Sequence, residues 1–475
     1  MPRRDWPAWA RASDIVDLVR LALPVAASRA AVPIMSATDV VVLGRNAQLE
    51  LPYITNGYLL VGLGLAVGMG ILQGVQVFTA ELSGVGEQRN TGRVLRRGLW
   101  VGLVLGVVFT LASWLSAGPM FHYLLVTVPE ARAAATGAEF DRAAAELIAA
   151  GTVTATNILA FGLIWHMLTV GGSLYLEALR RPGLVTALMY IGVLINLVID
   201  LALVAGWWGL PKMGADGVAW ATTGTRIVLT FGLFAVIALM TPGFKRSDPA
   251  PKDEFWRQNS VGAGGAIANV AEFGGFNLTF IIATWVSIVA ATIYSLAIQP
   301  IFLTFMIFMG LGTATSVRVA EAFGRGDAVQ VRDASRLGVV ACVVVGLFLA
   351  AFVWLAREPI AVFMVTRESE AGVDLLGPLT ALIGFTALVL IFDGLQGVAS
   401  MALRAQEVIW TPAAIQIGSY FGIMLPAAYW IGVVQGRGAM GVMEGVLIAS
   451  LAAGLAQTVV LETKTARRLS QRAVP

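Results

Sequence analysis

Long apolar runs recur along the whole chain, and they restrict its fold more than any other feature of the sequence. A helix needs about 20 mostly apolar residues to cross the hydrocarbon core of a bilayer. Because the backbone finds no water there, it has to satisfy its own hydrogen bonds, which favours helices. The sequence therefore predicts an all-α integral membrane protein with twelve transmembrane helices. The predicted spans lie at residues 17–43, 53–80, 95–117, 148–178, 183–207, 214–241, 257–286, 290–318, 334–356, 374–403, 409–434 and 438–461.

The composition agrees with a chain that is mostly surrounded by lipid. Only 13% of the residues are charged, about half the share in a soluble domain. The small net charge of +3 needs no explanation beyond basic cytoplasmic loops, so we expect no nucleic-acid partner. One cysteine and two histidines leave too few ligands for a Cys/His zinc site.

The basic residues define a topology for the predicted spans. If the N-terminus is cytoplasmic, the cytoplasmic loops and adjoining span ends hold 22 of the 32 Lys and Arg residues. The opposite loops hold 7 and the spans hold 3. Positive charge accumulates on the cytoplasmic side of membrane proteins, so the sequence predicts an even number of spans with both termini in the cytoplasm.

The second half of the chain repeats the first. The segment 80–98, which begins with Ala-Glu, recurs without gaps at 320–338. Shorter echoes relate 178–180 to 402–404 and 214–218 to 438–442. Both Ala-Glu copies fall on the predicted cytoplasmic side, so an even number of spans separates them. We therefore predict two parallel six-helix lobes, related by a pseudo-twofold axis along the membrane normal.

The lobe boundaries follow from the same pattern. We predict an N-terminal lobe over residues 1–241 and a C-terminal lobe over residues 257–475. Residues 242–256 combine three prolines with several charges, which is typical of a linker between domains.

Four carboxylic acids interrupt the predicted spans: Asp39, Asp200, Glu272 and Asp393. An ionisable side chain at the bilayer centre costs roughly 2.5–3.5 kcal/mol on insertion scales. A chain tolerates this cost where the acids face a water-filled cavity and bind a positive species. The four acids therefore indicate transport.

Three of the candidate residues lie at similar depth in the outer part of the N-terminal half. Asp39 is near the outer end of the first span, and Asp200 and Thr222 lie near the outer ends of the fifth and sixth spans. Asn196 precedes Asp200 by one helical turn. Together the four would form an all-oxygen cluster, which suits a hard cation such as sodium. Carboxylates at low dielectric also bind a proton readily.

The C-terminal half holds a second candidate site. Glu272 lies near the middle of the seventh span and Asp393 near the middle of the tenth. Their similar depth permits a shared cavity. Gln396 follows Asp393 at i+3 and could line the same helical face.

Internal ion pairing is the competing interpretation of these acids. Arg226 lies about mid-membrane and could neutralise Asp200 or Asp39, whereas Arg29 is too far along its helix to reach Asp39. A further acid, Glu444, has no obvious partner in the sequence.

Two other features have conventional interpretations. His166 is expected to be a hydrogen-bonded interior histidine, or otherwise a cavity residue. The Met and Phe residues at 302–309 are expected to pack between helices, although such faces can also form the wall of a promiscuous cavity.

Several of these segments resemble the multidrug and toxic compound extrusion (MATE) family, in particular its NorM-like bacterial branch. The likeness extends over roughly residues 15–460 and includes the repeated cytoplasmic loops at 84–98 and 324–338. In the motif of the first helix, Val40 occupies a position that is usually threonine in the family. The segments that carry the likeness are Asp393-Gly-Leu-Gln396 with the residues up to Arg404, Asp39-Val-Val-Val-Leu-Gly44-Arg45, Asn196-Leu-Val-Ile-Asp200, Ala221-Thr222 and Ala271-Glu272-Phe273.

The resemblance implies an exporter that is not an enzyme and is driven by sodium or protons, with no other cofactor. Two lobes would rock about a central cleft in a bacterial inner membrane and export small amphipathic, cationic compounds from a monomeric protein. Asp39, Asn196, Asp200 and Thr222 would form the N-lobe cation site, and Glu272 and Asp393, with Gln396, the C-lobe site. Val389 replaces a tyrosine found in some sodium-coupled relatives, which favours protons in the C-terminal lobe.

Two other functions compete with the export of drugs. A lipid or oligosaccharide flippase of the same wider superfamily usually has more cationic cavity residues, whereas the embedded charge here is mostly acidic. A membrane-embedded enzyme would need a nucleophile or metal set, and the sequence holds no histidine or cysteine cluster.

Overall fold

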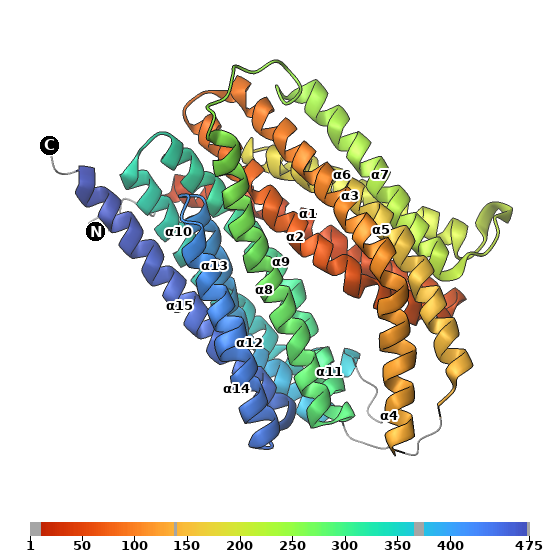
Figure 1. Cartoon of the computed structure of the whole chain (residues 1–475). Helices are drawn as coiled ribbons and strands as arrows, with labels where there is room; N and C mark the ends of the chain where they lie inside the picture. Colours follow the sequence, from red (N-terminus) through yellow and green to blue (C-terminus); the bar gives the residue numbers. More distant parts are fainter. Residues whose placement is uncertain (1–10, 137–139, 365–374, 473–475) are drawn as a thin grey trace.

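The computed structural model describes residues 11–136, 140–364 and 375–472, which form helices and connecting turns without a strand (Figure 1). The N-terminal half contains α1 (Ala12–Asn46), α2 (Leu51–Gly84), α3 (Thr91–His122), α4 (Val128–Thr136), α5 (Arg142–Ala178), α6 (Pro182–Leu203) and α7 (Gly214–Met240). The C-terminal half contains α8 (Glu254–Val286), α9 (Ile288–Gly324), α10 (Ala328–Leu355), α11 (Arg357–Met364), α12 (Leu376–Arg404), α13 (Trp410–Ile417), the π-helix η5 (Gly418–Met424), α14 (Leu425–Tyr429), the π-helix η6 (Trp430–Val434) and α15 (Gly438–Arg472).

The helices confirm the predicted all-α membrane fold. Within the described ranges, eleven helical stretches are long and apolar enough to cross a membrane, the run from α13 to η6 counting as one. The first predicted span is not among the eleven; it forms α1, where Arg20, Arg29 and Asp39 interrupt the apolar sequence. Its 35 residues still reach about 50 Å, and α1 packs against α6 and α9 as a twelfth long helix.

The amphipathic sequence of residues 118–147 predicts an outer segment that leads into the fourth span, but in the structure its first part continues the third helix. The third helix continues beyond residue 117 through a π-helical turn at Tyr123–Thr127 and directly into α4. Apolar side chains sustain the helix, and Val126 is fully buried. Asp141 then caps α5 by accepting a hydrogen bond from the backbone N–H of Ala144 at 3.0 Å, while Glu139 lies outside the described residues.

Two glycine contacts join the halves through the middle of the molecule. A Cβ on Gly70 of α2 would lie 2.2 Å from the backbone of Ala266 in α8. A Cβ on Gly310 of α9 would lie 2.6 Å from the carbonyl oxygen of Ala22 in α1. Gly70 and Gly310 differ by the 240-residue offset of the repeat, so the two crossings are pseudo-symmetric. Small residues allow such close backbone approach between membrane helices.

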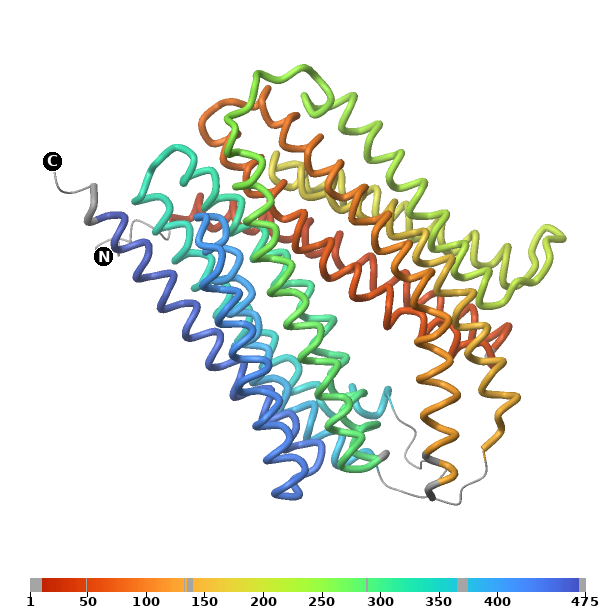
Figure 2. The backbone as a smooth tube through the Cα atoms, viewed as in Figure 1, coloured from red at the N-terminus to blue at the C-terminus, as the bar shows by residue number. Residues whose placement is uncertain are grey.

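The halves also meet at the end of the molecule that carries the connection between α7 and α8, residues 241–253, which we call the linker end. There α2 and α9 touch through Gly84, whose Cβ would lie 2.3 Å from the carbonyl oxygen of Glu321. Reciprocally, a Cβ on Gly324 would lie 2.4 Å from the carbonyl oxygen of Glu81. Figure 2 shows the two sets of helices converging at this end and diverging toward the other. The repeated Ala-Glu segments therefore form the junction between the halves.

The glycines inside one half give a test of the packing. We expect Gly106→Leu in α3 to lower the unfolding free energy by about 1–3 kcal/mol, as overpacked cores do, because a Cβ there would lie 2.6 Å from the Cα of Ile164. Gly118→Leu in the same helix is the control, since nothing lies within 4 Å of its Cβ position. Thermal unfolding of the purified protein in detergent measures both, and equal melting temperatures for the two variants would contradict the packing described here.

Candidate functional site

A cavity of about 510 Å³ lies between the two halves of the molecule. Its walls are mainly apolar and aromatic, and the two charged residues among its described lining residues are both acids. The lining comes from α2 (Gly62, Leu65, Ala66, Met69), α8 (Asn269, Glu272, Phe273, Phe276, Asn277, Phe280), α9 (Ile301, Phe302, Phe305, Met309) and α12 (Asp393). We call this cavity the central cleft.

The Met and Phe residues at 302–309 have a mixed role. Phe308 packs in the hydrophobic core, as expected, and is 2% exposed. Phe302, Phe305 and Met309 instead line the central cleft. For these three side chains the alternative interpretation, a cavity wall, is the correct one, because they occupy the face of α9 that is turned toward α2 and α8.

The structure brings together the three residues predicted for the C-terminal half. Glu272 lines the cleft from α8 and interacts electrostatically with Asp393 of α12. The Gln396 amide donates a hydrogen bond to Asp393 Oδ1 at 3.4 Å and a second one to the hydroxyl of Tyr420. Ser450 of α15 lies beside Asp393. The site therefore contains two carboxylates at the wall of the cleft, with an amide and a phenol buried behind them.

The phenol in this site was missed in the sequence. Val389 is fully buried and offers no oxygen, as expected. Tyr420 comes from η5, a different element, and interacts electrostatically with both Glu272 and Asp393. No spacing in the sequence relates Tyr420 to Asp393, since packing of the span 410–434 against α8 and α15 positions it.

The four residues predicted for the N-terminal half also form one cluster. The Thr222 hydroxyl of α7 donates a hydrogen bond to Asp39 Oδ2 of α1 at 3.2 Å. Asn196 and Asp200 of α6 lie next to Asp39. All four side chains are buried, and none of them is among the residues that line the central cleft. The cluster is thus enclosed by α1, α6 and α7 rather than open to the cleft.

The oxygen atoms of this cluster fit a small cation. Asp39 Oδ1, both carboxylate oxygens of Asp200 and the amide oxygen of Asn196 are buried without a hydrogen-bond partner. Buried polar atoms rarely lack a partner, and two adjacent carboxylates repel each other unless a positive species lies between them. All the available donors are oxygens, which suit sodium, and the carboxylates suit a proton equally well.

Arg226 does not neutralise this cluster by direct contact. It is buried on α7 and interacts electrostatically with Asp39, but among the described residues it forms no ion pair, and its Nη1 has no hydrogen-bond partner. Tyr58 of α2 lies near both Asp39 and Arg226 and was not identified in the sequence. The interpretation of the acids as permanently clamped groups therefore receives no support at Asp39 or Asp200.

Two further acids in the apolar helices are paired with arginines. Arg29 of α1 forms an ion pair of 2.9 Å with Glu177 of α5, an acid that was not singled out in the sequence although it is fully buried. Glu444, for which the sequence suggested no partner, pairs with Arg437 at 2.5 Å. His166 is partly buried on α5, and whether it is a hydrogen-bonded interior histidine or a cavity residue stays a prediction.

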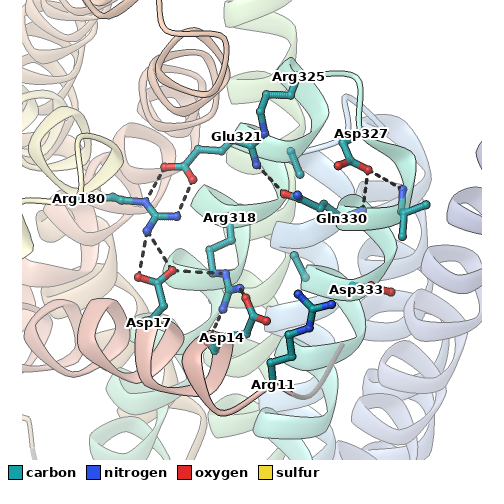
Figure 3. Close-up of a pocket in the computed structure, with 13 residues that line it drawn as sticks. Arg11, Asp14, Asp17, Arg180, Arg318, Glu321, Arg325, Asp327, Gln330 and Asp333 are labelled. Carbon is teal, nitrogen blue, oxygen red and sulfur yellow. Dashed lines mark hydrogen bonds and ion pairs between the residues drawn. The ribbon is translucent and has the colours of Figure 1, made fainter. Parts of the chain in front are cut away.

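Ion pairs connect the two halves at the linker end, around a cavity of about 460 Å³ (Figure 3). Arg180, which follows α5, donates two hydrogen bonds to Glu321 of α9 at 2.7 and 2.6 Å, and two more to Asp17 of α1. Arg318 of α9 donates to Asp14 of α1 at 2.6 Å. The hydrogen bonds to Glu321 raise the pKa of Arg180 above its already high value, so Arg180 keeps its positive charge at physiological pH.

A second set of contacts repeats this arrangement with the other Ala-Glu segment. Arg257 of α8 lies 3.6 Å from Glu81 of α2 and also donates a hydrogen bond to Glu407, which follows α12. The two glutamates of the repeat, Glu81 and Glu321, thus each face an arginine from the opposite half. Partly exposed pairs each contribute about 0.2–1 kcal/mol, so this end is closed by several weak contacts.

Comparison with known proteins identifies the family. The MatE family model matches residues 24–202 and 266–430, which is most of the chain. The chain is 30% identical over 458 residues to a probable multidrug resistance protein NorM of Caulobacter vibrioides, covering 93% of this chain and 90% of that protein. It is 28% identical to the multidrug resistance protein NorM of Burkholderia vietnamiensis, covering 94% and 92%.

Solved structures show the same fold. An outward-facing multidrug resistance MATE family transporter superposes with a TM-score of 0.83 at 16% identity over 96% of both chains. A eukaryotic MATE transporter gives a TM-score of 0.81 at 17% identity over 97% of this chain and 99% of that one. The family model, the NorM relatives and the shared fold lead to one conclusion: this chain belongs to the MatE family of multidrug efflux transporters and is not an enzyme.

Proposed function

We propose that the protein is a cation-coupled antiporter that exports amphipathic, cationic compounds through the central cleft. The observation that carries this proposal is the composition of the cleft, where Glu272 and Asp393 are set in an aromatic wall. Aromatic faces attract organic cations, and a carboxylate at low dielectric adds a strong attraction for positive charge. The volume of about 510 Å³ suits a drug-sized molecule. A flippase for phosphate-bearing lipids would need basic groups at this position.

We assign binding sites for the coupling cation to both halves of the molecule. In the N-terminal half, Asp39, Asn196, Asp200 and Thr222 would hold sodium or a proton with their oxygens. In the C-terminal half, Glu272 and Asp393, with Gln396 beside them, would exchange a proton for the substrate. Binding drives transport only if the cation favours one arrangement of the halves over the other. The N-terminal cluster is enclosed, whereas Glu272 and Asp393 line the central cleft, so a cation in the cleft would reach only the C-terminal acids directly.

The arrangement of the halves is assigned to the outward-open state. The linker end carries the excess of basic residues, so we place it and both termini in the cytoplasm of a bacterial inner membrane. The ion pairs of Arg180 and Arg257 would then close the cytoplasmic side. Residues 1–241 and 257–475 would move as two lobes about the linker 242–256, and one copy of the chain would hold the complete pathway.

Efflux from cells tests the assignment of the C-terminal acids. We expect Asp393→Asn to abolish ethidium efflux and norfloxacin resistance in a sensitive host, because the neutral amide neither binds the cation nor releases a proton. Glu444→Gln is the matched control, since Glu444 pairs with Arg437 outside the cleft. Wild-type protein that gives no efflux in the same host would contradict the proposed function.

The coupling ion is measured in proteoliposomes. Ethidium transport is followed with a proton gradient alone, a sodium gradient alone and neither. We expect Asp393→Asn to remove proton-driven transport, and Asp39→Asn to remove whatever response to sodium the wild type has, because sodium needs the oxygen cluster of the N-terminal half. Transport that persists without both gradients would rule out antiport.

Labelling of a cysteine in the central cleft tests whether the ion pairs keep the linker end closed. In a Cys342→Ala background, Met69→Cys places the single thiol in the cleft, where an impermeant maleimide reaches it from outside the cell. We expect Arg180→Glu to lower the labelled fraction, because each kcal/mol lost at the linker end shifts the ratio of the two states about fivefold. Arg142→Glu removes an arginine whose ion pairs stay within the N-terminal half and should leave labelling unchanged; equal labelling in both variants would overturn this assignment.

A further inference from the structure

One buried cation, Arg404, has no role in the site described so far. It is the last residue of α12 and is 5% exposed. Its Nε and Nη1 atoms have no hydrogen-bond partner, and it forms no ion pair with any described residue. A buried charge without a partner is strongly unfavourable, so this position requires a reason in the function of the molecule.

The helix that ends at Arg404 has a counterpart in the N-terminal half. Both α5 and α12 end in the same turn, in which Arg180 and Glu407 have positive φ angles of 58° and 59°. In these turns the N–H of Arg181 donates to the carbonyl of Leu176, and that of Val408 donates to Leu403. The turns align the two helices with an offset of 227, which replaces the offset of 224 suggested by the echo of 178–180 at 402–404 and pairs Glu177 with Arg404.

This alignment reveals the same set of polar positions on both helices. In each helix four polar residues follow one another at spacings of three, four and four, which places them on one helical face. They are His166, Thr169, Ser173 and Glu177 on α5, and Asp393, Gln396, Ser400 and Arg404 on α12. The last position carries a negative charge in one half and a positive charge in the other.

The residues on the neighbouring helices that interact with Glu177 and Arg404 also have opposite charges in the two halves. Glu177 pairs with Arg29 of α1, whereas Arg404 interacts electrostatically with Glu272 of α8. The glycine crossings give matching reference points on α1 and α8, at Ala26 and Ala266. Arg29 lies three residues after Ala26, and Glu272 lies six residues after Ala266. Glu272 is thus one helical turn farther from the crossing, on the corresponding face.

The two pairs differ in one respect. Arg29 and Glu177 are in direct contact at 2.9 Å, so their charges are permanently balanced. Glu272 instead lines the central cleft, and its distance from Arg404 exceeds that of an ion pair. We propose that Arg404 is the resident counter-cation of Glu272, which balances this acid whenever the cleft has no cation and thereby sets how tightly Glu272 and its neighbour Asp393 hold a proton.

This role rests on the proposed antiport and adds a positioning residue to it. When a protonated carboxyl of Glu272 or Asp393 loses its proton, the O–H bond breaks, the proton leaves to water, and the negative charge remains on the carboxylate. Arg404 stabilises that charge at a distance and keeps its own protons throughout. Because Arg404 makes no direct contact, an entering organic cation can replace it as the nearest positive charge.

The titration should involve few other groups. On the described elements packed around these acids, the charged or titratable side chains that face them are Glu272, Asp393, Arg404, Tyr420 and Cys342. Arg404 is the cation in this set. Removing it should therefore change the proton affinity of the acids in one direction, toward tighter binding.

Binding of tetraphenylphosphonium to the purified protein between pH 5 and 9 tests this role. In wild type, binding increases with pH as the acids ionise. We expect Arg404→Gln to move the midpoint upward by about one pH unit, which corresponds to a tenfold tighter hold on the proton. Arg404→Lys keeps the charge and should remain close to wild type. In a Glu272→Gln background, Arg404→Gln should have a much smaller effect, because interacting sites are not additive.

Each outcome decides the question. An unchanged midpoint in Arg404→Gln overturns the inference while the proposed function stands, whereas wild type that binds no cation at any pH overturns both. The single variant Arg404→Gln is compared with the double variant that also carries Glu272→Gln. If only the double variant folds, the two charges compensate each other as proposed. Failure of both variants to fold would show that Arg404 is needed only for stability, which rejects the inference.

Discussion

A carboxylate inside a lipid-embedded helix bundle must be balanced by a positive charge, and this requirement organises the whole molecule. The chain meets it in two ways. Glu177 is balanced permanently by Arg29 within one half, which leaves nothing to exchange. Asp39 and Asp200 have oxygens without partners, and Glu272 faces the central cleft, so a mobile cation can take the place of a fixed one. Only the second arrangement can couple binding to movement, since a permanently formed pair has the same energy in every state.

The contacts between the halves are divided into two kinds with different energies. The glycine crossings at Gly70 and Gly310 bring backbones together without side chains between them, and such close packing resists separation. The contacts at the linker end combine a glycine crossing with partly exposed ion pairs such as Arg180 with Glu321, each of which contributes little. The ion pairs at the linker end can therefore be broken at smaller cost than the close backbone contacts at the glycine crossings.

Sequence reasoning was most successful where periodicity and hydropathy decide the outcome. Residues at a fixed helical spacing, such as Asn196 with Asp200 or Asp393 with Gln396, lie together as expected, and both predicted clusters form. It failed for two contacts between helices that neither a helical spacing nor a shared membrane depth indicated. Tyr420 reaches Gln396 from a separate span, and Arg29 reaches Glu177 across 148 residues, so no local spacing signals either contact. The third span also extends past residue 117 through a π-helical turn, because polar residues near the membrane surface do not by themselves end a helix.

The internal repeat makes these missed residues informative. A duplicated fold places α5 and α12 in equivalent surroundings, so a change of charge between Glu177 and Arg404 is acceptable only if their partners change as well. Arg29 and Glu272 satisfy that condition on α1 and α8, although neither pair is visible when one half is read alone. The exchange also explains why the halves are not functionally identical. The N-terminal half neutralises its acid near the linker end and keeps Asp39 and Asp200 enclosed, whereas the C-terminal half presents its acid to the cleft and keeps the compensating arginine at a distance. The repeated scaffold thus holds one pair of opposite charges in direct contact and another pair of opposite charges apart.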